Sequence, residues 1–202
     1  MSEIAQADTY DSPNHRKYTS PSKVYAWHLR LVLNRIFELV ASTNPKSVLD
    51  AGCGEGFVVD ALKRRLPEVK FTGVDHSNAA IAYAKEHFSD SGFFRSGNLY
   101  KLPFSDRSFD TVLCLEVLEH LDDPSKALQE LQRVSRGSVI IAVPLEPYFQ
   151  WLNVLGQRLG VSLDPGHVNF WTKRGFQTFI RHHFAEPEFS WKHIYQFMVA
   201  TV

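Results

Sequence analysis

A glycine-alternating turn directly after a short apolar strand constrains this chain more than any other segment. The strand at residues 48–50 ends on Asp50, and Gly52, Gly54 and Gly56 follow it at alternate positions. A helical pattern begins at once and covers residues 57–66. Glycine lets the backbone turn tightly and bring bare N–H groups against a ligand where a Cβ would clash. The turn therefore predicts a nucleoside cofactor site at the carboxyl edge of a parallel sheet.

A dinucleotide is the first ligand to consider for such a turn. The G-x-G-x-x-G fingerprint needs its third glycine where helix and strand pack closely, but Phe57 occupies that position and Gly56 comes one residue early. Phe57 also rules out the Gly-Lys-Ser/Thr ending of a phosphate-binding loop. The acids Asp50 and Glu55 would repel a pyrophosphate, so the turn favours a cationic ligand over a nicotinamide cofactor.

The segment Asp50–Gly56 resembles the first motif of class I S-adenosylmethionine-dependent methyltransferases, and a second motif of that family follows. Residues 69–75 alternate like a strand and end on Asp75, about 20 positions after Gly56, where a Rossmann-type fold places its ribose-binding acid. A carboxylate accepts hydrogen bonds from both hydroxyls of a ribose, each contributing about 1.5–3 kcal/mol. The alternative is that Asp75 caps the helix predicted over residues 78–88, a role that Ser77 suits equally well.

Two further segments extend the resemblance. Residues 97–104 are similar to the stretch that contacts adenine in this family, with Asn98 in place of the usual acid. Asparagine still accepts a hydrogen bond through its carbonyl oxygen, although an ordinary polar loop would have the same composition. Residues 110–114 are predicted to form a buried strand, after which Glu116 begins the segment that borders the methyl group in the family.

The resemblance implies S-adenosylmethionine as cofactor, S-adenosylhomocysteine as product, and a set of binding residues for them. The set comprises Asp50, Ala51, Gly52 and Gly54 for the methionine part, Asp75 for the ribose, His76, Asn98 and Leu99 for the adenine, and Glu116 near the sulfonium. It also implies a Rossmann-like, doubly wound α/β fold, whose seven-stranded, mostly parallel sheet carries helices on both faces and ends in an antiparallel strand.

Hydrophobic periodicity and breakers predict the remaining elements and one domain. We expect helices over residues 24–41, 124–135 and 172–183, and strands over 138–143, 184–191 and 194–202. Residues 24–202 form the predicted methyltransferase domain, and residues 1–23 a flexible N-terminal segment that either folds over the cofactor or stays disordered. An aromatic helical stripe over residues 147–161 is expected to pack as core or lid rather than lie on a membrane.

Composition limits the partners and the compartment. The 22 basic and 22 acidic residues cancel, which argues against a general nucleic-acid binder. No apolar run approaches the ~18 residues of a membrane span, and the polar, acid-containing start does not resemble a signal peptide. The two cysteines, Cys53 and Cys114, both lie inside the cofactor motifs, so we expect reduced thiols and a cytoplasmic protein. The sequence leaves the oligomeric state open.

Methyl transfer needs little dedicated machinery, because orientation and exclusion of water supply most of the acceleration. A general base is required only for an acceptor that is protonated at the working pH. His120 follows the fourth predicted strand and His167 the fifth, so both are candidates for this base or for positioning the acceptor.

A metal site is an alternative use of the same region. Glu116, Glu119, His120 and His167 resemble the metal ligands of small-RNA terminal 2′-O-methyltransferases, and similar residues occur in ubiquinone-pathway O-methyltransferases. Such a set suits Mg²⁺, Mn²⁺ or Zn²⁺. The favoured interpretation has no metal, since metal-free relatives use these residues to hold loops and line the pocket.

The function predicted from these motifs is O- or N-methylation of a small-molecule or of a glycan- or lipid-linked acceptor. The first alternative is a metal-assisted O-methyltransferase that acts on an RNA 3′ end or a quinol. The second is a catalytically silent S-adenosylmethionine-binding protein.

Overall fold

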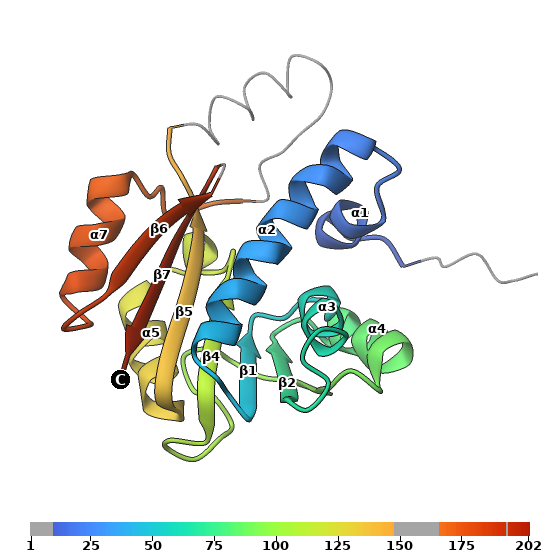
Figure 1. The fold of residues 1–202 in the computed structure, drawn as a ribbon, viewed down its shortest axis with the longest axis horizontal. Helices are drawn as coiled ribbons and strands as arrows, with labels where there is room; N and C mark the ends of the chain where they lie inside the picture. Colours follow the sequence, from blue (N-terminus) through green and yellow to red (C-terminus); the bar gives the residue numbers. More distant parts are fainter. Residues whose placement is uncertain (1–9, 148–165, 193) are drawn as a thin grey trace, which may run out of the picture.

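The fold is built on one twisted sheet, seen in the computed structural model, which describes residues 10–147, 166–192 and 194–202 (Figure 1). Its seven strands are β1 (Ser47–Ala51), β2 (Lys70–Asp75), β3 (Phe93–Ser96), β4 (Phe109–Leu115), β5 (Ser135–Pro144), β6 (Glu188–Lys192) and β7 (Tyr195–Thr201). Their spatial order is β3-β2-β1-β4-β5-β7-β6. Only β7 runs antiparallel to its neighbours, so the predicted seven-stranded, mostly parallel sheet is confirmed.

Helices cover both faces of the sheet, as predicted. They are α1 (Pro13–Thr19), α2 (Lys23–Ser42), α3 (Phe57–Lys63), α4 (Asn78–Phe88), the 3₁₀ turn η1 (Leu118–His120), α5 (Pro124–Val134) and α7 (Lys173–Arg181). Buried side chains of α2, α3 and α4 share one apolar cluster, and those of α5 and α7 share the other. Successive residues of a strand serve opposite clusters, since Val48 packs with the first and Leu49 with the second. The two clusters therefore enclose the sheet between two helical layers.

Side-chain caps explain why several helices begin where the sequence predicts. Ser77 accepts a hydrogen bond from the backbone N–H of Ala80 at the start of α4, and Thr172 accepts one from Gly175 at the start of α7. Each cap satisfies a backbone donor that has no partner inside the helix. The bounds of α4 agree with the prediction, and α7 ends two residues before the predicted end.

Strand β5 begins at Ser135, three residues before the predicted start, and includes Pro144, which was expected to stop it. Its pairing with β4 shifts register between Phe109 and Thr111, so the strand continues through an irregularity. Gly137 makes this possible, because a Cβ there would lie 2.5 Å from the carbonyl oxygen of Asp110.

The predicted strand over residues 184–191 is wrong at its start, since β6 begins at Glu188. The N–H of Phe184 donates to the carbonyl oxygen of Ile180 and so closes the end of α7, and Pro187 has no N–H to offer a strand. The predicted helix over residues 57–66 is also too long, because α3 ends at Lys63. Three elements, α1, β3 and η1, have no counterpart among the predicted segments.

Other sequence-based expectations stay partly outside the described residues. Of the predicted stripe over residues 147–161, only Pro147 is described. Helix α1 lies within the segment predicted to be flexible, and the domain boundary near residue 23 stays a prediction. In the part of the chain that the structure describes, we find no helix with both the length and the apolar character needed to cross a bilayer.

Gly73 in β2 offers a test of how tightly this sheet is packed. An added Cβ would lie 2.6 Å from Cδ1 of Phe94 and 2.7 Å from Sγ of Cys53. We expect Gly73→Ala to lower the free energy of unfolding by about 1–3 kcal/mol in urea denaturation. The control is Gly175→Ala in α7, where the nearest atom is the Thr172 hydroxyl and alanine favours the helix. Equal effects of the two substitutions would contradict this account of the core.

Candidate functional site

The glycine turn lies at the carboxyl ends of β1 and β2, as predicted. Its three glycines, Gly52, Gly54 and Gly56, all have positive φ angles, of 92°, 51° and 85°. The N–H groups of Gly52 and Cys53 both donate to the carbonyl oxygen of Val74, at 2.7 and 3.0 Å, which ties the turn to β2. A Cβ on Gly52 would lie 2.3 Å from Cγ2 of Val117, so this position admits only glycine without rearrangement.

Asp75 holds the turn from the neighbouring strand. One carboxylate oxygen accepts the N–H of Gly54 at 2.9 Å, and the other accepts the N–H of Ser77 at 2.8 Å. Ser77 itself caps α4, so Asp75 is not the cap. A carboxylate has about four acceptor positions, and those beyond these two contacts remain for hydroxyl donors. His76 beside it is largely exposed, with Nδ1 3.3 Å from Asp75.

Asp50 gives the turn its electrostatic character. Its side chain is buried, and burial together with the charge of Asp75 raises the pKa of Asp50 from 3.8 to about 7. Two acids at the ends of adjacent strands disfavour each other's ionisation, and a nearby cation would relieve that cost. The turn therefore has the electrostatics of a cation-binding site, in agreement with the argument against a pyrophosphate.

The predicted adenine-contacting segment forms a tight turn after β3. Asn98 is exposed, and its side-chain oxygen accepts the N–H of Tyr100 at 2.8 Å. Leu99 is buried in the apolar cluster on the α5 side of the sheet. The asparagine oxygen thus already stabilises its own turn, and only its second lone pair remains for a ligand.

The N-terminal segment, for which the sequence left open whether it folds over the cofactor or stays disordered, lies directly on the glycine turn. The carboxylate of Glu55 accepts hydrogen bonds from Tyr10, Ser12 and Asn14. The Asn14 amide also lies against Gly54, since a Cβ on that glycine would lie 2.8 Å from it. The turn and helix α1 are therefore fastened together through Glu55.

Glu116 makes a second connection to α1. It follows β4 with a positive φ of 56°, and its carboxylate pairs with the ammonium group of Lys17. The hydroxyl of Tyr195, at the start of β7, donates to the same carboxylate at 3.0 Å. Three segments that are distant in the sequence thus meet at Glu116, which is predicted to lie near the sulfonium.

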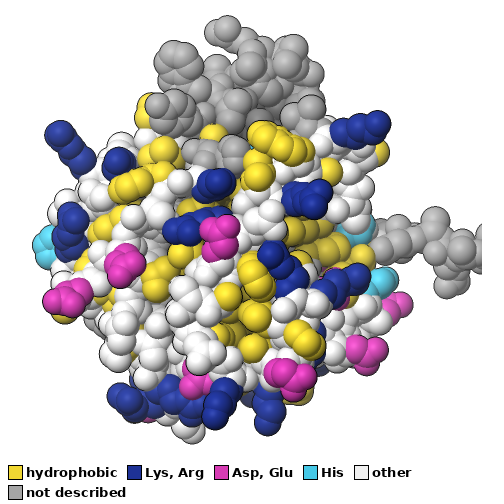
Figure 2. Space-filling model, viewed as in Figure 1, with side chains coloured by type: hydrophobic (Ala, Val, Ile, Leu, Met, Phe, Trp, Pro, Cys, Tyr) yellow, Lys and Arg dark blue, Asp and Glu magenta, His cyan; other side chains and the backbone are white. Residues whose placement is uncertain are grey.

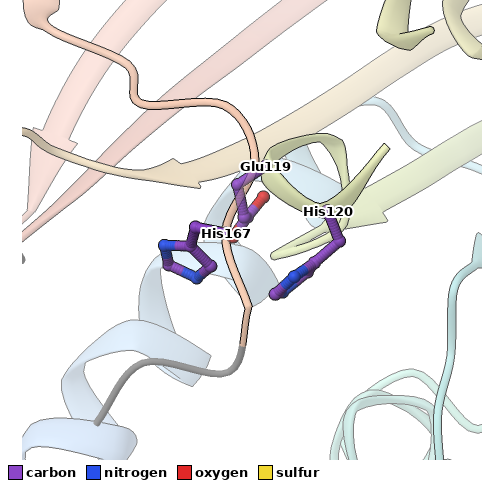
Figure 3. A group of neighbouring side chains, drawn as sticks. All are labelled: Glu119, His120 and His167. Atoms are coloured by element: carbon purple, nitrogen blue, oxygen red, sulfur yellow. The ribbon is translucent and has the colours of Figure 1, made fainter. Parts of the chain in front are cut away.

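Three of the predicted acceptor-side residues come together beyond Glu116. Ligand-competent atoms of Glu119, His120 and His167 all lie within 4.8 Å of one another. Figure 3 shows the two imidazole rings on either side of the Glu119 carboxyl group, one from η1 and one from the segment after β5. Glu119 is 1% exposed, burial raises its pKa to about 8, and neither side-chain oxygen has a hydrogen-bond partner among the described residues.

The backbone holds this group in place. The N–H groups of Val168 and Asn169 donate to the carbonyl oxygen of Glu119 at 2.8 and 3.0 Å. The Asn169 amide donates to the carbonyl oxygens of Leu118 and Leu121 at 3.1 and 2.6 Å. These bonds fix His167 against η1, and Asn169 is a site residue that the sequence motifs did not indicate. Glu116 stays outside the group, since Lys17 and Tyr195 already occupy its carboxylate.

Comparison with known proteins places this site in context. The family model described as a methyltransferase domain matches residues 49–143. The chain is 36% identical over 115 residues to the demethylmenaquinone methyltransferase of Thermotoga maritima, covering 56% of this chain and 50% of that protein. It is 30% identical over 180 residues to the ubiquinone biosynthesis O-methyltransferase of Hahella chejuensis, covering 85% and 74%. The chain thus spans about half the length of the first of these relatives.

Solved structures share the fold at lower sequence identity. The methyltransferase domain of bacterial CtHen1 superposes with a TM-score of 0.70 at 22% identity, over 86% of this chain and 99% of that one. Magnesium protoporphyrin IX methyltransferase from Synechocystis, with bound S-adenosylhomocysteine, superposes with a TM-score of 0.69 at 20% identity, over 94% and 92%.

The raised pKa of Asp50 predicts a pH-dependent effect of Asp50→Asn on stability. A carboxyl group whose pKa is raised in the folded state lowers the free energy of unfolding as the pH rises from the pKa of the unfolded chain to that of the folded one. The difference in unfolding free energy between Asp50→Asn and wild type should therefore rise between about pH 4 and pH 7, by at most about 1.4 kcal/mol per pH unit, and then level off. Urea denaturation at a series of pH values measures this difference, and a flat profile would contradict the burial account.

Proposed function

The chain belongs to the class I S-adenosylmethionine-dependent methyltransferases, as its motifs predicted, and from this premise we propose that it methylates a hydroxyl group of a small quinol-type acceptor. The observation that carries the proposal is the buried, doubly acidic glycine turn, which suits a cationic adenosyl ligand. The acceptor class is supported by relatives named for demethylmenaquinone and ubiquinone biosynthesis.

The residues present fit S-adenosylmethionine. The positive φ angles of the turn and the crowding at Gly52 require glycine there, and the acids Asp50 of β1 and Asp75 of β2 lie at the same edge of the sheet. When bound, S-adenosylmethionine would supply the methyl group of its sulfonium; the sulfur would keep the electron pair of the broken S–C bond, and the product would be S-adenosylhomocysteine. In the proposal, Asp75 accepts the ribose hydroxyls and Asp50 faces the cationic methionine part. His76, Asn98 and Leu99 border the adenine.

The histidines supply the acceptor chemistry in this proposal. As the acceptor oxygen forms its bond to the methyl carbon, its hydroxyl proton passes to an imidazole nitrogen of His120 or His167. The two rings lie with centroids 4.8 Å apart, so one can orient the acceptor while the other takes the proton. The bonds from Asn169 and Val168 hold the backbone segments of both histidines together, and such preorganisation would favour transfer.

Ligand binding tests the cofactor half of the proposal. S-adenosylmethionine and S-adenosylhomocysteine should raise the melting temperature, and NAD should not. Asp75→Ala removes both acceptor oxygens and should weaken S-adenosylmethionine binding by about tenfold or more, whereas Asp75→Asn keeps one acceptor and should lose less. Asp90→Ala, an exposed change near the end of α4, is the matched control. Stabilisation by NAD alone, or full affinity in Asp75→Ala, would contradict the assignment.

A metal-assisted O-methyltransferase is a second candidate, and one observation favours it. The Glu119 carboxyl is buried and neither oxygen has a hydrogen-bond partner in the described part of the chain, yet two imidazoles lie within reach of a shared ion. Such an orphaned buried acid is costly unless something pairs with it. One carboxylate and two imidazoles suit Zn²⁺ or Mn²⁺ better than Mg²⁺. With a metal present, these three residues would hold it beside the acceptor, which can then be a quinol or an RNA 3′ end.

Titration of chelator-treated protein with Zn²⁺, Mn²⁺ and Mg²⁺ separates the two candidates. Metal assistance predicts binding of one ion by calorimetry, a higher melting temperature, and loss of both effects in Glu119→Gln. A labelled-methyl assay then compares a hydroxylated quinol with an RNA oligonucleotide, with and without chelator. If no ion binds and chelator leaves transfer intact, the metal candidate fails and the histidines act as bases. If neither acceptor is labelled although S-adenosylmethionine binds, the quinol proposal fails.

A further inference from the structure

The charge of this chain is neutral overall but uneven along its length. Residues 12–37 contain five lysines and arginines and no aspartate or glutamate. The acids that border this stretch are used locally, because Asp11 pairs with Arg16 and Glu38 pairs with Arg35. Within the residues that the structure describes, Lys23 and Arg30 have no ion-pair partner. Of the five cations, only Lys23 and Arg30 are therefore not neutralised by an acid of the described residues.

The two unpaired cations share a face of α2 with a large aromatic side chain. Lys23, Trp27 and Arg30 follow one another at helical spacing, and all three are exposed, Trp27 at 58%. The opposite face of α2 carries the buried residues Val32 and Ile36 against the sheet. The outward face thus combines an exposed indole with two cations, and we call it the α2 face.

An apolar groove continues the α2 face toward α1 and α3. It has a volume of about 280 Å³. Ala26, Leu29, Leu33 and Phe37 line it, with Arg30 and Arg65 at its rim. The guanidinium of Arg65 lies 3.5 Å from the ring centroid of Phe37. In Figure 2, dark blue and yellow side chains lie together over α1 and the first half of α2. The groove places apolar surface directly beside the cations.

A second group of basic residues shows what distinguishes the α2 face. Lys46 and Lys70 are exposed neighbours at the amino ends of β1 and β2, where the Lys70 N–H donates to the Lys46 carbonyl oxygen. Nearby Arg136 pairs with Asp110. None of the large exposed apolar side chains of the described residues belongs to these strand starts. This group has charge but no large exposed apolar side chain at the starts of β1 and β2, so it provides a matched control.

We propose that the α2 face and its groove bind the surface of an anionic phospholipid membrane. Indole rings prefer the headgroup level of a bilayer, and cations on an amphipathic surface are attracted to anionic lipids. A nucleic acid would depend mainly on phosphate neutralisation, and it would gain little from the apolar groove. The inference does not rest on the proposed function, and it would place the chain where a lipid-linked acceptor is found.

Vesicle sedimentation with the full chain tests this inference. At about 0.1 M salt, the chain should bind vesicles made from a roughly equal mixture of phosphatidylglycerol and phosphatidylcholine. It should bind vesicles of phosphatidylcholine alone much more weakly. The double variant K23E/R30E should lose about tenfold or more in affinity, and Trp27→Ala should also bind less. The control K46E/K70E makes the same charge change at the other edge of the sheet and should bind like wild type. Trp191→Ala, which removes another exposed indole, should do the same.

Circular dichroism and melting check that each variant folds, and K23Q/R30Q replaces K23E/R30E if charge reversal unfolds the chain. Equal losses in K23E/R30E and K46E/K70E would overturn the inference, as would binding that does not need anionic lipid. If an RNA oligomer, added at the same total negative charge as the lipid, releases the chain from the vesicles, the α2 face would be assigned to nucleic acid instead. Vesicle binding by a chain that transfers no methyl group would leave this inference standing and the proposed function rejected.

Discussion

A single carbonyl group organises the cofactor side of this molecule. The oxygen of Val74 accepts two consecutive N–H groups, from Gly52 and Cys53, and so joins the turn after β1 to the end of β2. Parallel pairing of β1 and β2 brings Asp50 and Asp75 to the same edge of the sheet, where the charge of Asp75 acts on Asp50. Had the turn any residue but glycine at position 52, Val117 would block the conformation that makes these bonds. The geometry of the turn and the closeness of Asp50 to Asp75 therefore depend on the contact between the turn and the Val74 carbonyl group.

The site has two halves with different physical character, and Glu116 lies between them. One half is the acidic glycine turn, where burial and the charge of Asp75 raise the pKa of Asp50. The other half is the group of Glu119, His120 and His167, which is held by backbone bonds from the segment after β5. Both halves contain a buried acid whose desolvation is costly for folding, and such costs concentrate where a protein binds or reacts.

Local signals in the sequence predicted the parts of the structure that local physics decides. Helix α4 was predicted with its observed bounds, because Ser77 is a strong cap before an amphipathic stretch. His120 and His167 were both expected near the ligand edge, since each follows a strand and β4 and β5 are neighbours in the sheet. Strand β3 was missed because it has only four residues and exposes Phe93, so it lacks a clear alternation.

Contacts between distant segments were beyond such reasoning. Lys17 and Glu116 are 99 positions apart, and Tyr195 joins them from 79 positions further on. Nothing near Lys17 in the sequence marks it as a partner of the fourth strand. Asn169 is likewise an ordinary loop residue until the fold places it beneath η1. Glu55 was interpreted only as a charge that repels phosphate, although its main contacts are with Tyr10, Ser12 and Asn14.

The fastening of α1 has a consequence for the binding of a cationic ligand. Lys17 places an ammonium group beside Glu116 and over the rings of Tyr18 and Tyr195, in surroundings that would also suit a sulfonium. A cationic ligand that reaches Glu116 would compete with Lys17 for this carboxylate and weaken one of the contacts that hold α1. The charge of the ligand would thus exchange with that of Lys17, and α1 would be held less tightly while the ligand is bound. A bulky tag joined to the N-terminus would act on that exchange first.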